Sequence, residues 1–130
     1  MPAINFRAQW ANKVESGAKR QTIRAPRKDG RPTAKVGDRL YLYVGLRTKG
    51  CRKLGEGVCT YTGQVVITPE RRIIVDGRPV DGAMADQFAK ADGFDHESAL
   101  LDFFEITHGL PFEGSLIQWF PNPSDKGTKA

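Results

Sequence analysis

The stretch R-L-Y-L-Y-V-G-L-R at Arg39–Arg47 constrains the fold of this chain more than any other feature of its sequence. Leucine or valine occupies every second position, and Tyr41 and Tyr43 stand between these aliphatic residues. Side chains of a β-strand point alternately to the two faces of a sheet, so the pattern predicts a strand with one aliphatic face and one tyrosine-bearing face. The core of this protein is therefore expected to be built on a β-sheet.

Other segments with a period of two residues, or rich in β-branched residues, predict further strands. These are expected over 20–24, 57–68, 71–75 and 114–120, with a D-G-R-P turn over 76–79. In the first of them, Arg20, Thr22 and Arg24 would share one face of the strand, and Gln21 and Ile23 the other.

Three helices are expected around these strands. The first would carry Phe6, Trp10 and Val14 on one stripe at four-residue spacing and would end at Gly17. The other two are expected over 82–91, with Met84 and Phe88 on one stripe, and over 96–108, with Asp95 as N-cap and Gly109 at the end.

This order of elements is typical of an α+β fold. The sheet is expected to be mostly antiparallel and able to close into a small barrel. With 130 residues the chain has the length of one domain, which we place at 1–120. The segment 121–130, P-N-P-S-D-K-G-T-K-A, is expected to be a flexible tail.

The composition, with 39% hydrophobic and 27% charged residues, is that of a soluble globular protein. No apolar run reaches membrane-spanning length, and the start M-P-A-I-N-F-R does not have the pattern of a signal peptide. We therefore expect a cytoplasmic protein without a membrane partner. Cys51 and Cys59 match no zinc signature, so no metal and no cofactor are expected.

The net charge of +5 is distributed unevenly along the chain. The segment 19–53 contains twelve Lys and Arg residues against two Asp residues, whereas 81–118 contains eight acidic residues and one lysine. A basic surface attracts polyanions, although a basic segment also serves simply as a solvated loop.

The segment S-G-A-K-R-Q-T-I-R contains the sharpest functional signal. It brings together an amine at Lys19, a hydroxyl at Thr22 and a guanidinium at Arg24. A desolvated amine can lose its proton near neutral pH and then deprotonate a neighbouring hydroxyl, as in Ser–Lys hydrolases. A guanidinium can bind a phosphate or carbonyl oxygen. On spacing alone, the pattern is better explained by surface charges at Lys19 and Arg24 beside a strand threonine.

Basic and aromatic residues elsewhere are candidates for contacts with a nucleic acid or nucleotide. They are Arg20, Arg24, Arg27, Lys28, Tyr41, Tyr43, Arg47 and Arg52. His96 and His108 could act as acid or base in RNA cleavage, or could simply lie at helix ends.

The run G-A-K-R-Q-T-I-R resembles the G-x-K-x-x-T-x-R signature of ASCH-domain proteins, which are relatives of the PUA, YTH and EVE domains. Three later segments are similar to further ASCH motifs in the same order. They are V-G-D-R-L-Y-L-Y at 36–43, D-Q-F-A-K-A-D-G-F at 86–94 and the closing G-S-L-I-Q-W at 114–119. The resemblance extends over about 5–120 and implies a PUA-like barrel with a cleft between sheet and helices.

Some ASCH proteins are amidohydrolases that remove the acetyl group from N4-acetylcytidine with a Lys, a Thr and a Glu. The resemblance places Lys19 and Thr22 at the first two positions and Asp92 at the third, with Asp86, Asp95 and Glu97 as rivals. Aspartate is one methylene shorter than glutamate, and a carboxylate set back by about an ångström can cost on the order of a hundredfold in rate.

Three functions remain open from the sequence. The first is a module that binds RNA or a modified nucleoside in a basic cleft. The second is a metal-independent hydrolase, either an amidohydrolase acting on N4-acetylcytidine or a ribonuclease acting on single-stranded RNA. The third is an adaptor for another protein, although no obligate protein partner is identifiable.

Overall fold

The protein is an α+β domain with a mixed seven-stranded sheet and three α-helices. The computed structural model describes residues 2–26, 29, 31 and 33–121. The elements are β1 (Ala3–Phe6), the 3₁₀ turn η1 (Ala8–Trp10), α1 (Ala11–Ser16), β2 (Gln21–Arg24), β3 (Arg39–Val44), β4 (Arg52–Ile67), β5 (Ile73–Val75), β6 (Arg78–Val80), α2 (Gly82–Ala91), α3 (Glu97–His108) and β7 (Phe112–Pro121).

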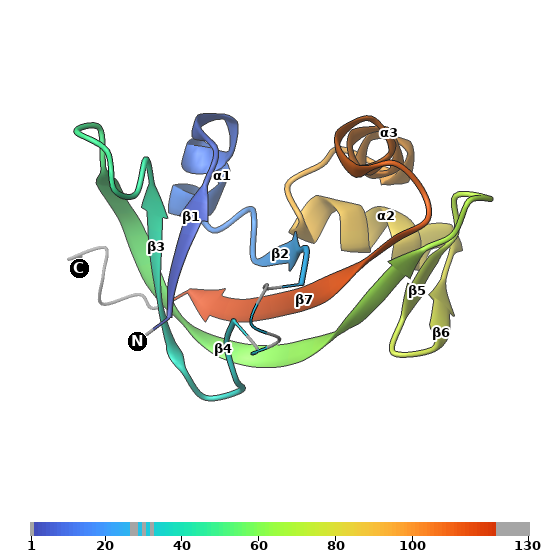
Figure 1. The fold of residues 1–130 in the computed structure, drawn as a ribbon, viewed down its shortest axis with the longest axis horizontal. Helices are drawn as coiled ribbons and strands as arrows, with labels where there is room; N and C mark the ends of the chain where they lie inside the picture. Colours follow the sequence, from blue (N-terminus) through green and yellow to red (C-terminus); the bar gives the residue numbers. More distant parts are fainter. Residues whose placement is uncertain (1, 27–28, 30, 32, 122–130) are drawn as a thin grey trace.

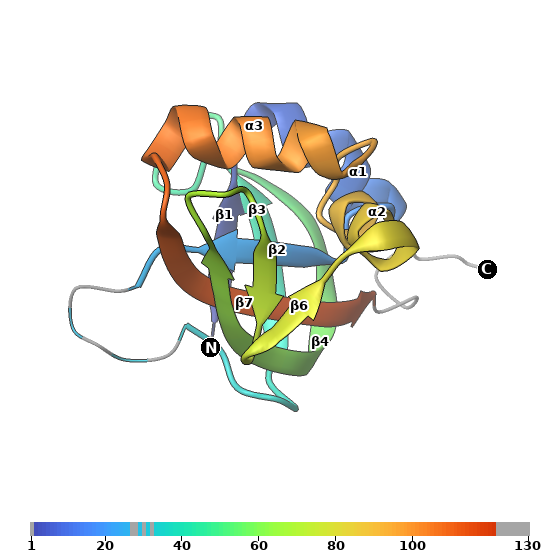
Figure 2. The same ribbon diagram turned by 90° about the vertical axis from the view of Figure 1, so that its right-hand side faces the viewer.

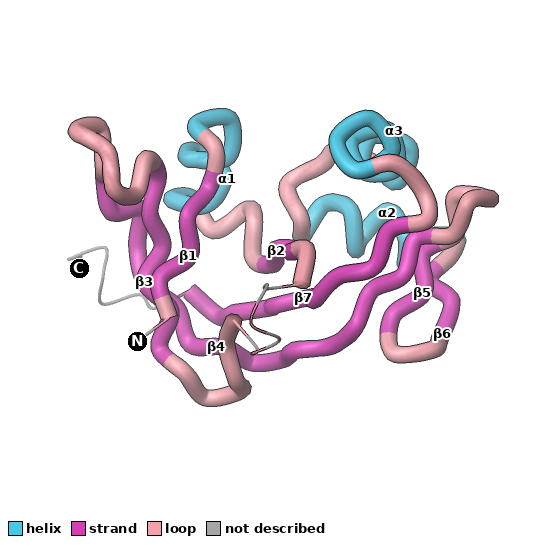
Figure 3. The backbone as a smooth tube through the Cα atoms, viewed as in Figure 1, coloured by secondary structure: helices cyan, strands magenta, loops and turns pink. Residues whose placement is uncertain are grey.

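The sheet is organised on β4, the longest strand, which pairs with β3, β5 and β7. The pairing of β1 with β3 is parallel, and every other pairing between described strands is antiparallel. The sheet bends into a trough with β1 and β3 at one end and β5 and β6 at the other (Figure 1). The three helices lie on the same side of it (Figure 3).

The strands do not close into a barrel, so that part of the prediction is wrong. Within the described part of the chain, β1 pairs only with β3, β6 only with β5, and β2 only with β7. The helices α2 and α3 pack on the inside of the trough, and Leu100, Leu101 and Phe104 join the strand residues of one core cluster there. The edges of the sheet therefore stay apart because helices occupy the space in which they would meet (Figure 2).

The hydrophobic core consists of two clusters. The first contains residues from β1, α1 and β3 together with Trp119 of β7. The second contains residues from β2, β4, β5 and β7 packed against α2 and α3. Four buried polar residues accompany them: Lys19 shortly before β2, Gln21 and Thr22 within β2, and Asp92 directly after α2.

Several sequence predictions are confirmed by the structure. The strand predicted over Arg39–Arg47 is β3, although it ends at Val44 and not at Arg47. Leu40 and Leu42 are buried in it, and Tyr41 and Tyr43 are half-buried. The bounds of α2 are those predicted, and Gly109 follows α3 directly. A glycine with positive φ, Gly17, ends α1 as expected.

Other predictions are wrong, each for a physical reason. Phe6 belongs to β1 and not to the first helix, because Ala3–Phe6 gains backbone hydrogen bonds along the edge of β3. Met84 is 67% exposed because α2 buries its alanine face instead. The N-cap of α3 is His96 and not Asp95, since the His96 ring accepts a hydrogen bond from the Ala99 amide. Pro121 is the last residue of β7, and the rest of the predicted tail lies outside the described residues.

No helix among the described residues is long and apolar enough to cross a membrane.

Gly114 permits the close packing of β2 against β7. A Cβ at this position would overlap the carbonyl oxygen of Arg24 and lie 2.8 Å from the Phe112 ring. We expect Gly114→Ala to lower the free energy of unfolding by roughly 1–3 kcal/mol, as overpacking does elsewhere. Urea denaturation measures this change. The control is Gly50→Ala, whose Cβ would meet nothing closer than 3.7 Å, and equal stability of the two variants would contradict the prediction.

Candidate functional site

A cavity of about 220 Å³ opens above β2. One wall consists of residues from β1 and η1, and the other consists of residues from α3 and the connection between α2 and α3. The floor includes Lys19 and the β2 residues Thr22 and Arg24. The segment with the sharpest sequence signal therefore lies at the base of a pocket.

The local backbone conformation places Lys19 at the floor of the cavity. The chain leaves α1 through Gly17, whose φ of 84° reverses its direction. The Arg20 amide then donates to the Ala91 carbonyl at 2.8 Å, which ties the start of β2 to the end of α2. The Lys19 side chain points inward and is only 3% exposed.

The Lys19 amine contacts Asp92 twice. Its Nζ donates to the Asp92 backbone carbonyl at 2.5 Å and lies 3.5 Å from the carboxylate atom Oδ2. The same nitrogen lies 5.0 Å from the centre of the Trp10 ring and 5.8 Å from that of Phe6. The amine is thus enclosed by one carboxylate, one carbonyl and two aromatic rings.

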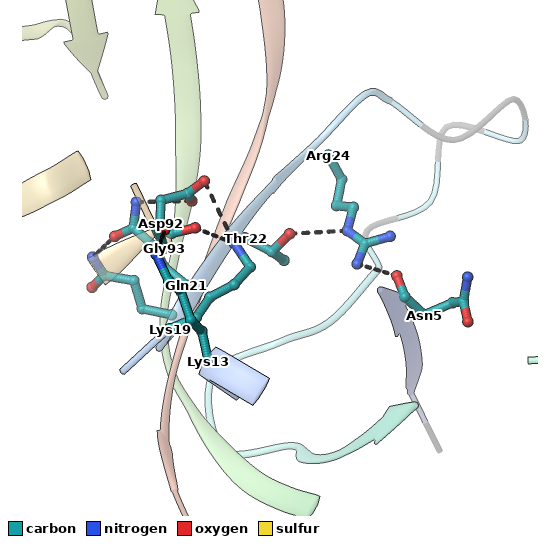
Figure 4. Close-up of polar contacts among 9 residues, drawn as sticks. Asn5, Lys13, Lys19, Gln21, Thr22, Arg24, Asp92 and Gly93 are labelled. Carbon is teal, nitrogen blue, oxygen red and sulfur yellow. Dashed lines mark hydrogen bonds and ion pairs between the residues drawn. The ribbon is translucent and has the colours of Figure 1, made fainter. Parts of the chain in front are cut away.

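Asp92 is held from its other side by a chain of amides. Its Oδ1 accepts a hydrogen bond from Gln21 Nε2 at 3.2 Å, and Gln21 Oε1 accepts one from Gln118 Nε2 at 3.0 Å. Figure 4 shows Gln21 and Lys19 approaching Asp92 from different directions. These contacts fix which carboxylate oxygen faces Lys19.

Burial shifts the protonation equilibria of this pair. It raises the pKa of Asp92 to about 6, and the nearby Lys19 and Gln21 only partly oppose the shift. It also lowers the pKa of Lys19, against the attraction of Asp92. Desolvation therefore outweighs the mutual attraction, so both groups are nearer to neutrality than they would be in water.

Thr22 and Arg24 form the adjacent part of the floor. The Thr22 hydroxyl oxygen accepts a hydrogen bond from Arg24 Nε at 3.1 Å, and Arg24 Nη2 donates to the Asn5 carbonyl at 2.6 Å (Figure 4). The guanidinium also lies over the Phe6 ring, and burial lowers the pKa of Arg24. Because the hydroxyl accepts from Arg24, its own proton stays available for donation.

An aromatic cluster forms much of the cavity wall. Trp10 lies 4.9 Å from Phe94 and 6.0 Å from Phe103, measured between ring centres. Gly93 allows this packing because a Cβ there would lie 3.0 Å from the Trp10 ring. Aromatic walls of this kind suit a planar ligand.

The structure brings Lys19, Thr22, Arg24 and Asp92 together around one cavity. It does not bring the rival acids there. Asp86 accepts a hydrogen bond from the Glu97 amide outside the cavity, and Asp95 is exposed.

The remaining predicted ligand-binding residues lie elsewhere. Arg20 is exposed and donates to the Gly17 carbonyl, and Arg52 is paired with Glu15 at 2.7 Å. Tyr41, Tyr43 and Arg47 do not line the cavity. The Lys53 amine lies 5.4 Å from the centre of the Tyr41 ring, and Arg47 is exposed in the turn that follows β3. Arg27 and Lys28 are outside the described residues.

Sequence reasoning missed several residues of the site. The residue pattern places Gln21 on a strand face and assigns it no role, although Gln21 contacts Asp92. Arg7 and the aromatic cluster also line the cavity. His108, which the sequence offers as an acid or base, lines the cavity from the end of α3. No spacing in the sequence relates these residues to Lys19, because they come from separate elements.

No group of three or more His, Cys, Asp or Glu side chains suited to a metal ion occurs within the described part of the chain. Cys51 is exposed and Cys59 is buried, and both are free thiols.

Comparisons with known proteins do not identify this chain: no family model, no curated protein and no solved structure matches it. The arrangement offers a buried amine and a hydroxyl that line the same cavity, a carboxylate that orients the amine and a guanidinium bonded to the hydroxyl oxygen. These are the parts of a nucleophile activated by a base.

The raised pKa of Asp92 predicts how the stability of the protein depends on pH. Its ordinary value is 3.8 and its value here is about 6, so the folded protein binds more protons than the unfolded chain between these two pH values. This contribution to stability is complete below about pH 4 and is lost as the pH rises through about 6. Carbon-13 NMR of the side-chain carboxyls should give a midpoint near 6 for Asp92. Lys19→Met should raise the Asp92 midpoint further, and an unchanged midpoint would contradict the proposed contact.

Proposed function

We propose that this chain is an ASCH-type domain that acts as a metal-independent hydrolase on a small planar amide of the N4-acetylcytidine type. The single observation that carries the proposal is the burial of the Lys19 amine in the same cavity as the Thr22 hydroxyl. A module that only binds a ligand has no need of a buried lysine near a hydroxyl. A lysine that acts as a general base does need burial, because burial lowers its pKa toward neutrality. The motif G-x-K-x-x-T-x-R, which contains both residues, supports the same assignment.

Asp92 orients the base in this proposal. A neutral Lys19 amine has two protons and one lone pair. Donation of the protons to the Asp92 carbonyl and carboxylate leaves the lone pair for the Thr22 hydroxyl. Aspartate is shorter than the glutamate of the family pattern, but its carboxylate lies 3.5 Å from Lys19 Nζ. The shorter side chain is therefore compatible with this role.

The reaction proceeds in two steps. Lys19 removes the Thr22 proton, and the Thr22 oxygen attacks the amide carbonyl while the Arg24 guanidinium stabilises negative charge on the reacting oxygens. The carbon–nitrogen bond breaks, the departing amine takes the proton from Lys19, and an acyl ester remains on Thr22. Water then attacks this ester with Lys19 again accepting a proton, which releases the carboxylic acid and restores the hydroxyl.

Turnover of N4-acetylcytidine by the purified protein, followed by mass-resolved chromatography, tests this function. We expect Lys19→Ala and Thr22→Val to lower kcat by at least about a hundredfold, because each removes a group that takes part in the chemical step. Thr22→Ser should keep much of the activity because it retains the hydroxyl. Lys90→Ala, at an exposed lysine of α2, is the matched control and should be unchanged.

Loss of activity must be separated from loss of the fold. Circular dichroism and thermal unfolding of each variant make this distinction. An inactive wild-type protein, or full activity of folded Thr22→Val, would contradict the proposal.

RNA binding is the second candidate function, and the exposed turn between β3 and β4 favours it. Arg47 and Lys49 are both exposed there. Counterion release makes such binding dependent on salt. If this turn binds RNA, Arg47→Gln should make the slope of log Kobs against log salt shallower by roughly 0.7 for the lost phosphate contact. Fluorescence anisotropy with a short single-stranded RNA measures the slope, with Arg72→Gln as control, and an unchanged slope excludes a role for Arg47.

A further inference from the structure

One cation of the cavity has no role in the proposed chemical step. Arg7 follows β1, is exposed and lines the cavity. Its guanidinium lies over the Phe103 ring, 5.6 Å from the ring centre. No carboxylate pairs with Arg7 within the part of the chain that the structure describes. A cation held over an aromatic ring without a counter-ion is free to bind an anionic ligand.

The charge of the cavity is positive in both protonation states of Lys19. The ionisable lining residues are Arg7, Lys19, Arg24 and Asp92, together with His108. With His108 neutral and Asp92 ionised, the sum is +2 when Lys19 is protonated and +1 when it is neutral. Asp92 is one carboxylate facing three basic side chains, so the cavity favours an anion over a neutral molecule of the same shape.

The size of the cavity decides where the anionic group would lie. Pockets that enclose a whole drug-sized ligand measure roughly 300–1,000 Å³. At about 220 Å³ this cavity holds only part of a nucleotide. Exposed lining residues mark its mouth, and Arg7 and His108 are among them. A base bound beside Lys19 and Thr22 would therefore leave its sugar and phosphate near Arg7.

We propose that the substrate carries a phosphate group on its ribose, and that Arg7 is the residue that selects it over the uncharged nucleoside. This inference rests on the proposed function, because it places the amide-bearing base inside the cavity. The phosphate belongs either to a mononucleotide or to an RNA strand. In both cases Arg7 would contact a phosphate group. An RNA strand would place further nucleotides outside the cavity, and a mononucleotide would not.

The first experiment compares kcat/KM for N4-acetylcytidine, its 5′-monophosphate and a short RNA with one N4-acetylcytidine. The wild-type protein should prefer the monophosphate to the nucleoside by roughly 10–100-fold, the range expected for a charge-assisted hydrogen bond. Arg7→Gln should bring this ratio close to one, mainly through KM. Arg72→Gln, at an exposed arginine that does not line the cavity, should keep the wild-type ratio. A higher kcat/KM for the RNA identifies the polymer as the source of the phosphate.

A binding experiment separates failure of this inference from failure of the proposed hydrolysis. Calorimetric titration with cytidine and with cytidine 5′-monophosphate needs no turnover. Tighter binding of the monophosphate, lost in Arg7→Gln, supports the inference even if no substrate is hydrolysed. Equal affinity for the two ligands, or a preference that survives in Arg7→Gln, overturns it even if the nucleoside is hydrolysed.

Discussion

The contact between Lys19 and Asp92 joins the two halves of this protein. Lys19 follows α1, which packs in the core cluster of β1 and β3, and Asp92 follows α2, which packs in the cluster of β5 and β7. The two residues are 73 positions apart in the chain, and both are buried. A buried ion pair is weak evidence for stability, since desolvation can exceed the attraction gained. Its position at the base of a cavity is the feature on which the proposed chemical role rests.

The backbone around this contact is arranged to hold it. Lys13 Nζ donates to the Gly93 carbonyl at 2.5 Å, one peptide beyond the carbonyl that Lys19 contacts. Two lysines from the same segment thus bind consecutive carbonyls of the connection between α2 and α3. Gly93 adopts a φ of 102° and leaves no room for a side chain between Trp10 and the Lys19 stem. The connection is consequently positioned by hydrogen bonds and by close packing together.

The two candidate functions depend on different parts of the molecule. Hydrolysis depends on the cavity floor, where Lys19 and Thr22 are buried, and RNA binding depends on the exposed turn after β3. Several basic residues that the sequence offers for a polyanion are already engaged with acids, as Arg52 is with Glu15 and Arg39 with Glu56. The basic half of the chain is therefore less positive at its surface than its composition indicates, and the cavity is a second positively charged region.

The sequence alone determined the α+β class, most of the strands and the bounds of α2, and it singled out Lys19, Thr22 and Arg24 as candidates, because these depend on short-range periodicity and spacing. Through the resemblance to ASCH proteins it also suggested Asp92 as the acidic residue of the site, with Asp86, Asp95 and Glu97 as alternatives. Only the tertiary structure decided that Asp92 and not Asp86 or Asp95 meets Lys19, that Gln21 supports it and that Arg7 lies at the same cavity. It also decided that the sheet stays open. These features arise from contacts between segments far apart in the chain, and no local pattern of residues encodes which distant side chains will share a pocket.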